Sequence, residues 1–325
     1  MPVMTYLEAI SLGLREEMQR NPDVFLIGED IGVYGGAFKV TKGFLEEFGA
    51  DRVMDTPISE AGIIGVCVGS ALMGLRPVAE MQFADFISCG FNQMVNQAAK
   101  IHYRWREAVP MVVRCPSGGG VHGGPFHSQN PEAWFFHVPG LKIVSPSTAY
   151  DAKGLIKAAI RDNNPVLFFE HKFLYRRVKD EVPEDDYIVP IGKGDIKRSG
   201  KDITIIAYSS AVHWALEAAA IAEKEDGLSV EVLDMRSLLP YDKDLILESV
   251  RKTNKVIIAH EATLTGGIGG DIGAFITEHA FESLDGPIRR VASLDTPVPY
   301  SPPLEAYVLP NKDKMLNVIR ELAAY

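Results

Sequence analysis

Strand-like and helix-like segments alternate along almost the whole chain, and this alternation constrains the fold most strongly. Short apolar runs such as 23–30 and 77–83 are typical of buried strands, while 5–21 and 148–162 have helical periodicity. A chain that returns to a strand after each helix builds a mostly parallel sheet with helices on both faces. The sequence therefore predicts an α/β fold.

One stretch interrupts the alternation. Residues 172–199 are charged, contain Pro and Gly, and lack helical periodicity, and a second alternating set then runs to a closing helix at 311–323. The 325 residues are enough for two domains of ordinary size. We therefore expect two doubly wound domains, a larger one over 1–183 and a smaller one over 201–325, joined by a linker at 184–200.

Composition excludes several classes of protein. The net charge of −10 argues against a general nucleic-acid binder, which normally has a basic face. The N-terminus lacks a basic region followed by an apolar run, and the most apolar run, 61–75, is too short to span a bilayer. We expect a cytoplasmic protein, or one of the mitochondrial matrix, with neither nucleic acid nor membrane as partner.

The cysteines do not indicate a special site. Cys67, Cys89 and Cys115 are odd in number, widely spaced and without a CxxC motif, so neither a disulfide framework nor a zinc site is expected. All three have apolar or small neighbours in the sequence. We expect them to be core thiols.

Polar residues occur where predicted strands end, which is where ligands bind in open α/β sheets. Taken singly, these residues have ordinary explanations. Glu60 could be a first-turn helix acid, Phe86 a core residue, and His127 a hydrogen-bonded loop histidine. The segments concerned are Glu29–Asp30, Thr56 to Glu60, Gln82 to Phe86, and 117–129.

The familiar nucleotide motifs fit poorly. The loop 117–129 contains G-x-G-x-x-G, but Pro125 and His127 follow where a helix should open, and no acidic partner ends a well-placed strand. The GGIGGD segment at 266–271 precedes a helix and could hold an anion, although we favour a tight turn.

Taken together, the segments resemble the beta subunit of the thiamine-diphosphate-dependent component of 2-oxo acid dehydrogenase complexes. The resemblance runs nearly end to end, and it implies a transketolase-like pyrimidine-binding domain followed by a transketolase C-terminal-like domain. It also implies oxidative decarboxylation of a 2-oxo acid with acyl transfer to lipoyllysine. The matching blocks include GEDIGVYGGAFKVTKGF, RVMDTPISEAGIIG, RPVAEMQFADF, RCPSGGGVHGGPFHSQNPEAWF, IRDNNPVLFFEHKFLYR and HEATLTGG.

The resemblance assigns the cofactor pocket. A glutamate after T-P-x-S, here Glu60, would share a proton with the ring nitrogen of the aminopyrimidine and so favour its imino tautomer. That tautomer can take the proton from the thiazolium carbon. The apolar surroundings expected for Glu60 would keep it protonated part of the time. Phe86 would stack on the pyrimidine, and Ile58 and Gln82 would line the same pocket.

The resemblance also assigns a substrate residue and an ion site. His127 would meet the substrate carboxylate and assist acyl transfer, while His122 either contributes or is structural. Asp162 and Asn164 match a loop that binds a structural monovalent cation, K⁺, in relatives.

The second half of the cofactor site is not expected in this chain. The diphosphate–magnesium motif begins G-D-G and ends in Asn-Asn, and the GGD at 269–271 is not followed by it. By resemblance, an alpha subunit would hold the diphosphate and Mg²⁺, in a heterotetramer of two alpha and two beta subunits. The small-residue helix 61–75 is then either a packed core helix or, as the resemblance favours, an interface helix.

The resemblance implies a further partner and a substrate class. Asp285 and the carboxylate of Tyr325 are candidate acceptors for arginines of the subunit-binding domain of a dihydrolipoyl acyltransferase, whose lipoyl domain would receive the acyl group; otherwise they are solvated surface acids. QFADF and HEATLTGG favour a branched-chain over a pyruvate enzyme. An acetoin-cleaving enzyme, a non-catalytic assembly subunit and a nicotinamide-dependent dehydrogenase remain as alternatives.

Overall fold

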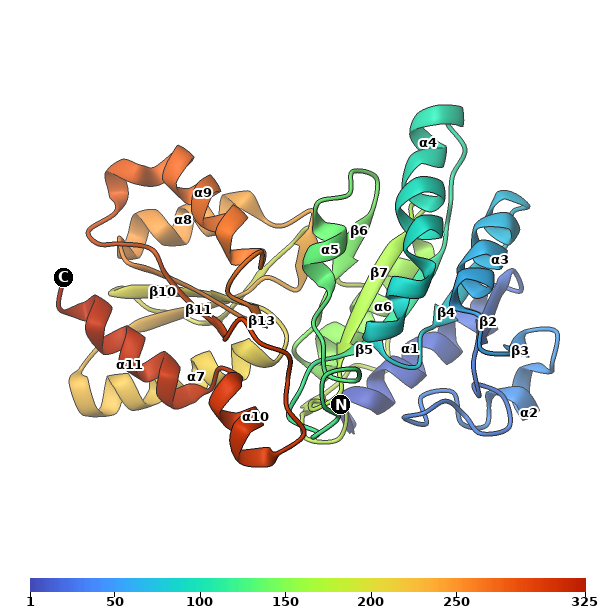
Figure 1. The fold of residues 1–325 in the computed structure, drawn as a ribbon, viewed down its shortest axis with the longest axis horizontal. Coiled ribbons are helices and arrows are strands. Elements are labelled where there is room, and N and C mark those ends of the chain that lie inside the picture. Colours follow the sequence, from blue (N-terminus) through green and yellow to red (C-terminus); the bar gives the residue numbers. More distant parts are fainter. The chain divides into compact units, whose positions relative to one another are not determined.

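The computed structural model describes residues 1–325, which form two compact units (Figure 1). The first unit comprises Met1–Ser117 and Trp134–Ile191, and the second comprises Gly118–Ala133 and Gly192–Tyr325. The sequence pattern places the loop 118–133 in the first domain, whereas in the structure this loop packs within the C-terminal unit. The exact borders 1–183, 184–200 and 201–325 stay predictions.

The first unit is built on parallel strands in the order β6-β7-β5-β4-β2-β3. The strands are almost entirely buried, which explains why they read as continuous apolar runs rather than as alternating patterns. The strands are β2 (Val24–Gly28), β3 (Val53–Asp55), β4 (Arg76–Glu80), β5 (Val112–Ser117), β6 (Lys142–Val144) and β7 (Val166–His171).

Two long helices of the first unit, α1 (Tyr6–Arg20) and α6 (Ala149–Arg161), pack against each other over the main core. Gly13 permits this close approach, because a Cβ there would lie 2.6 Å from the Ile156 side chain. Thr5 begins α1 with a complete capping box to Glu8. The remaining elements are β1 (Val3–Thr5), α2 (Phe44–Phe48), α3 (Glu60–Leu72), η1 (Ala84–Gly90), η2 (Gln93–Ala98), α4 (Ala99–Trp105), α5 (Glu132–Phe136) and β8 (Lys179–Glu181).

The second unit contains a five-stranded sheet in the order β14-β13-β10-β11-β9, in which only β9 is antiparallel to its neighbour. Figure 1 shows α8 and α9 on one side of this sheet and α7 and α11 on the other. The elements are β9 (Asp195–Arg198), β10 (Ile203–Ala207), α7 (Ser210–Asp226), β11 (Val230–Asp234), β12 (Ser237–Leu239), α8 (Lys243–Thr253), β13 (Val256–Thr263), α9 (Gly269–Ala280), η3 (Phe281–Ser283), β14 (Arg289–Ser293), α10 (Pro302–Val308) and α11 (Lys312–Ala323).

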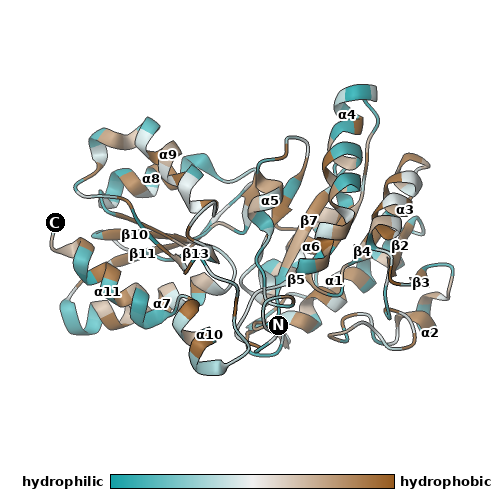
Figure 2. Cartoon of the chain, in the orientation of Figure 1, coloured by the Kyte–Doolittle hydropathy of each residue, from teal (hydrophilic) through white to brown (hydrophobic).

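The predicted α/β architecture is confirmed. In Figure 2 the strands are mostly hydrophobic, whereas the helices carry both hydrophilic and hydrophobic residues. The helix expected at 90–106 is present over 91–105, and its hydrogen bonding changes from π-helical in η2 to α-helical in α4. None of the helices combines the length and the apolar character that a membrane span requires.

One expectation about the thiols is wrong. Cys67 and Cys115 are buried as predicted, and burial raises the pKa of both thiols. Cys89 is exposed instead, because it lies in the last turn of η1, where Ser88 and Cys89 both face outward.

A buried ion cluster crosses the middle of the first sheet. Arg114 on β5 is 1% exposed, and its Nε and Nη2 donate to the two carboxylate oxygens of Glu170 on β7 at 2.6 and 2.7 Å. Its Nη1 donates to Glu80 on β4. Tyr175 donates its hydroxyl to Glu170 at 2.6 Å. Burial raises the pKa of Glu80, and the attraction of Arg114 opposes this rise. The cluster thus ties three adjacent strands together near their carboxyl ends.

Replacing Arg114 should therefore destabilise the first unit strongly. Arg114→Met would leave two buried carboxylates without their cation, and we expect a loss of about 3–5 kcal/mol in the free energy of unfolding by urea. Arg15→Met, which removes the half-exposed pair with Glu47, is the control and should cost less than about 1 kcal/mol. Equal losses for the two variants would contradict the structural role of the buried cluster.

Candidate functional site

Several predicted site residues lie at one edge of the first sheet. The register sets Gly28 at the end of β2 level with Asp55 on β3 and with Glu80 on β4. The residues that follow these strands, including Glu29, Thr56 and Gln82, therefore leave the sheet at its carboxyl edge.

Glu60 is the first residue of α3 and is half-buried. No hydrogen bond or ion pair in the structure involves its carboxylate. Ser59 occupies the N-cap position, but its side chain makes no capping hydrogen bond. Glu60 thus suits the positive end of the helix dipole, as the ordinary explanation requires, yet its oxygens are free for a ligand.

Glu29 is a candidate site residue whose position in the sequence marks it only as a strand end. Its side chain is 6% exposed, and Oε1 has no hydrogen-bond partner. Burial raises the pKa of Glu29, the neighbouring charge of Glu60 raises it further, and a hydrogen bond from the Ser59 backbone opposes both. Thr56 Oγ1 is also buried without a partner. Unpartnered buried polar atoms are rare, and here they lie beside a free carboxylate, as expected of a site for a hydrogen-bonding ligand.

The other predicted pocket residues differ in their contacts with the rest of the chain. Phe86 on η1 is half-buried and packs edge-on against Phe83, with ring centroids 5.8 Å apart. Gln82 donates its amide to Asp30 Oδ2 at 3.1 Å. Ile58, by contrast, is 82% exposed and is free to contact a ligand or another chain.

The two loop histidines belong to the second unit, and the structure distinguishes them. His127 is half-buried, and its backbone N–H donates to the Gly124 carbonyl at 3.3 Å. His122 is tied down, because its Nδ1 lies 2.5 Å from Glu305 Oε2. The sequence left open whether His122 is structural, and this contact favours that alternative.

The predicted ion loop already has protein donors. Asp162 accepts hydrogen bonds from Lys142 Nζ at 2.5 Å and from the side-chain amide of Asn164 at 2.8 Å. The Asp162 carbonyl accepts from Arg76 at 3.0 Å. By resemblance the ion would be bound through backbone carbonyls, and the Asp162 carbonyl already accepts a hydrogen bond. The cation site at Asp162 and Asn164 stays a prediction.

The predicted docking acids lie near each other on the second unit. Asp285 and Tyr325 are both exposed. The chain brings their neighbourhoods together, since a Cβ at Gly286 would lie 3.4 Å from that of Tyr325.

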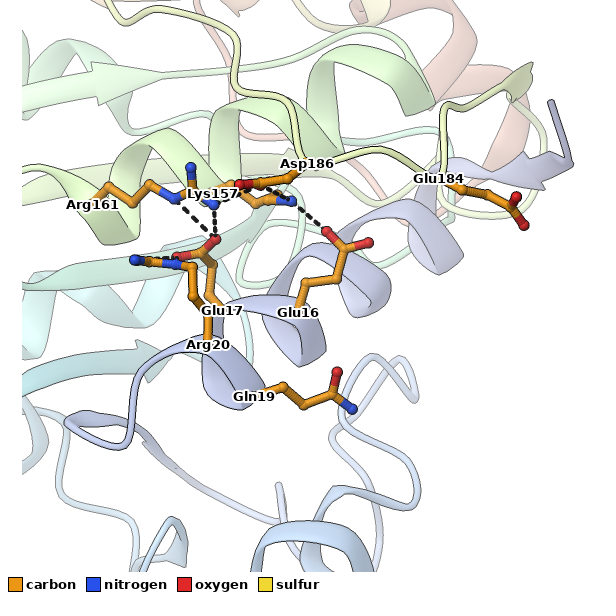
Figure 3. Close-up of a pocket in the computed structure, with 8 residues that line it drawn as sticks. All are labelled: Glu16, Glu17, Gln19, Arg20, Lys157, Arg161, Glu184 and Asp186. Carbon is orange, nitrogen blue, oxygen red and sulfur yellow. Dashed lines mark hydrogen bonds and ion pairs between the residues drawn. The ribbon is translucent and has the colours of Figure 1, made fainter.

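A hollow of about 350 Å³ in the first unit is not a catalytic site (Figure 3). In Figure 3, Lys157 pairs with Glu16 and Asp186, and Arg161 pairs with Glu17 and Asp186, whereas Glu184 lies apart from these pairs. Hydrogen bonds from Arg161 and Lys157 lower the pKa of Asp186 to about 2. The groups satisfy one another and fasten the segment around Asp186 to α1 and α6.

Comparisons with known proteins agree with this architecture. Residues 3–178 match the family "Transketolase, pyrimidine binding domain", and residues 192–315 match "Transketolase, C-terminal domain". The fold is similar to that of a solved "Split gene transketolase, inactive beta4 tetramer", with a TM-score of 0.81 and 23% identity over 99% of this chain and 98% of that chain. The fold and its site thus define a two-domain protein of the transketolase type.

Sequence relatives narrow the class. The chain is 54% identical to the 2-oxoisovalerate dehydrogenase subunit beta of Bacillus subtilis (strain 168), over the full length of both. It is 46% identical to the acetoin:2,6-dichlorophenolindophenol oxidoreductase subunit beta of the same organism, over 98% of this chain and 97% of that protein. The chain belongs to the family of beta subunits of thiamine-diphosphate-dependent 2-oxo acid dehydrogenases.

Proposed function

We propose that this beta subunit serves an enzyme that oxidatively decarboxylates a branched-chain 2-oxo acid and transfers the acyl group to lipoyllysine of an acyltransferase, in the cytoplasm or the mitochondrial matrix. The observation that carries the catalytic part is the free carboxylate of Glu60 beside the buried, incompletely bonded Glu29. The higher identity to the 2-oxoisovalerate enzyme than to the acetoin enzyme of one organism supports the branched-chain substrate.

The residues present fit the pyrimidine half of thiamine diphosphate. An aminopyrimidine offers ring nitrogens and an amino group. Glu29 Oε1 and Thr56 Oγ1 are buried without hydrogen-bond partners, and the half-buried Glu60 at the start of α3 offers a carboxylate. The Phe86 ring, with Ile58 and Gln82, would provide the pocket walls. When bound, the cofactor supplies the electron sink for decarboxylation.

In this proposal Glu60 holds a proton at the ring nitrogen of the pyrimidine. Burial and the neighbouring charge of Glu60 raise the pKa of Glu29, so Glu29 would keep a proton available beside Glu60. Such proton sharing is general acid–base catalysis by a positioned side chain. His127 would meet the carboxylate of the 2-oxo acid and assist acyl transfer, and no step is assigned to K⁺.

The outer face of α3 supports a contact with an alpha subunit. The buried residues of α3 lie on one side, while Gly62, Gly65, Val66, Gly69 and Leu72 are exposed on the other. A Cβ at Gly65 or Gly69 would have nothing within 4 Å. An exposed face of small and apolar residues is typical of an interface at which backbones approach closely. We assign this face to the alpha subunit, which would hold the diphosphate and Mg²⁺ in a heterotetramer of two alpha and two beta chains.

The second partner would dock on the other unit. The Asp285 and Tyr325 carboxylates are exposed and lie in neighbouring segments, which suits a basic partner. We assign them to the subunit-binding domain of the dihydrolipoyl acyltransferase.

The α3 interface makes a size-dependent prediction. Gly69→Leu should leave the isolated chain folded, since a Cβ at this exposed position has nothing within 4 Å and leucine favours a helix over glycine by about 1 kcal/mol. It should nevertheless prevent the heterotetramer from forming on size-exclusion chromatography, whereas Gly69→Ala should permit it. Ala220→Leu, at an exposed position on α7, is the control. A heterotetramer of normal size with Gly69→Leu would contradict the assignment.

The substrate is tested with the reconstituted heterotetramer. Among 2-oxoisovalerate, pyruvate, 2-oxoglutarate and acetoin, we expect the highest kcat/KM for 2-oxoisovalerate, by about tenfold or more, because one or two methylenes in an apolar pocket discriminate by about this factor. A preference for pyruvate or acetoin would contradict the branched-chain assignment. Absence of turnover with all four would favour a non-catalytic assembly subunit.

A further inference from the structure

The loop Gly118–Ala133 is held within the C-terminal unit by buried carboxylates that no step of the proposed reaction uses. This loop carries His127. Its base is closed by the Gly118 N–H, which donates to the Gln129 carbonyl at 3.1 Å. The two arms of the loop are held by side chains that are distant in the sequence.

Glu261 on β13 anchors both arms of the loop. It is 5% exposed, and its Oε1 accepts the Gly119 N–H at 2.6 Å and the Asn130 side-chain amide at 3.0 Å. Its Oε2 accepts the Ser210 hydroxyl at 3.1 Å. One buried carboxylate therefore fixes the residues before and after His127, and its donors compensate for much of the cost of burial.

Glu305 on α10 holds the middle of the first arm. It is 2% exposed, its Oε1 accepts the Gly120 N–H at 2.9 Å, and its Oε2 lies 2.5 Å from His122 Nδ1. His122 has a φ of 60°, in the left-handed region that a non-glycine residue seldom adopts. A conformation of this kind persists only where the surroundings impose it, and Glu305 provides the contact that does so here.

Two further contacts restrict the loop. Tyr208 donates its hydroxyl to Glu132 at 2.6 Å near the end of the loop, and burial beside Glu132 raises the pKa of the phenol, so that it remains a donor. A Cβ at Gly124 would lie 2.1 Å from the Tyr300 ring, so only glycine fits at this position. These contacts and the lack of space at Gly124 therefore hold the loop in one conformation.

We infer that Glu261 and Glu305 are positioning residues, and that His122 is the contact through which Glu305 fixes the loop that presents His127. The C-terminal unit then acts in substrate binding by containing the loop that carries His127 and by fixing that loop through this clamp. The expected effect of the clamp on KM rests on the proposed role of His127. The existence of the clamp does not depend on that role. Loosening the clamp should weaken binding of the 2-oxo acid carboxylate more than it slows decarboxylation.

The test uses the reconstituted heterotetramer with His122→Ala, Glu305→Gln and the double variant. Each single variant should raise the KM for 2-oxoisovalerate about tenfold with kcat for decarboxylation changed less than about threefold, as expected for loss of ground-state binding. The double variant should raise KM by less than the product of the two single effects, because the two side chains share one contact. Glu282→Gln, an exposed acid of the same unit, is the control and should keep the wild-type values.

Amide hydrogen exchange tests the clamp independently of the enzyme's activity. Amides of peptides covering 118–130 should exchange at least about tenfold faster in His122→Ala and Glu305→Gln, with the exchange of β10 and β11 unchanged. Wild-type exchange rates in the loop of these variants would overturn the clamp. The clamp would also be overturned if His127→Asn raises KM while His122→Ala and Glu305→Gln leave KM unchanged. If His127→Asn leaves KM unchanged while the loop exchange accelerates, the clamp stands and the proposed role of His127 fails.

Discussion

The buried guanidinium of Arg114, held between Glu80 and Glu170, sets the geometry on which the first unit depends. It fixes β4, β5 and β7 relative to one another at the edge where their polar residues emerge. Glu80 also limits the loop after β2, because a Cβ at Gly36 would lie 2.8 Å from its Oε1. Removing one member of a buried ion cluster lowers the free energy of unfolding strongly, whereas replacing the whole cluster by apolar residues often costs little. The cluster therefore fixes the geometry of the strands more than it adds stability.

Fixed strand ends allow a carboxylate pair to be built from distant segments. Glu29 follows β2 and Glu60 begins α3, and burial with mutual repulsion makes the charged form of Glu29 unfavourable. A carboxyl whose pKa is raised by burial and by a neighbouring acid is suited to hold a proton for transfer. In the second unit, buried Glu261 and Glu305 have donors around them and serve to hold a loop instead. Buried glutamates thus have two different uses in this chain. One that lacks donors is suited to holding a proton, and one surrounded by donors holds a loop in place.

The sequence predicts the parallel strands well, because strands buried on both faces appear as apolar runs. It misses β1, β8 and β9, which are short and partly exposed and are held by backbone pairing: β8 reads Lys-Asp-Glu, and β9 lies within the expected linker. The pocket residues Glu60 and Phe86 could be assigned because they lie in contiguous blocks that resemble a known family. The clamp could not, since Gly120 and Glu305 are 185 positions apart and no local pattern links them.

In the proposed reaction, Glu60 activates the cofactor by sharing a proton with the pyrimidine ring. The most direct measurement is the rate at which the thiazolium C2 proton of bound thiamine diphosphate exchanges with deuterium in the heterotetramer. Glu60→Gln should slow this exchange by about 100-fold or more, the usual worth of a positioned acid or base, while Glu46→Gln on the exposed side of α2 should not. Exchange at the wild-type rate in Glu60→Gln, with the cofactor still bound, would contradict the account.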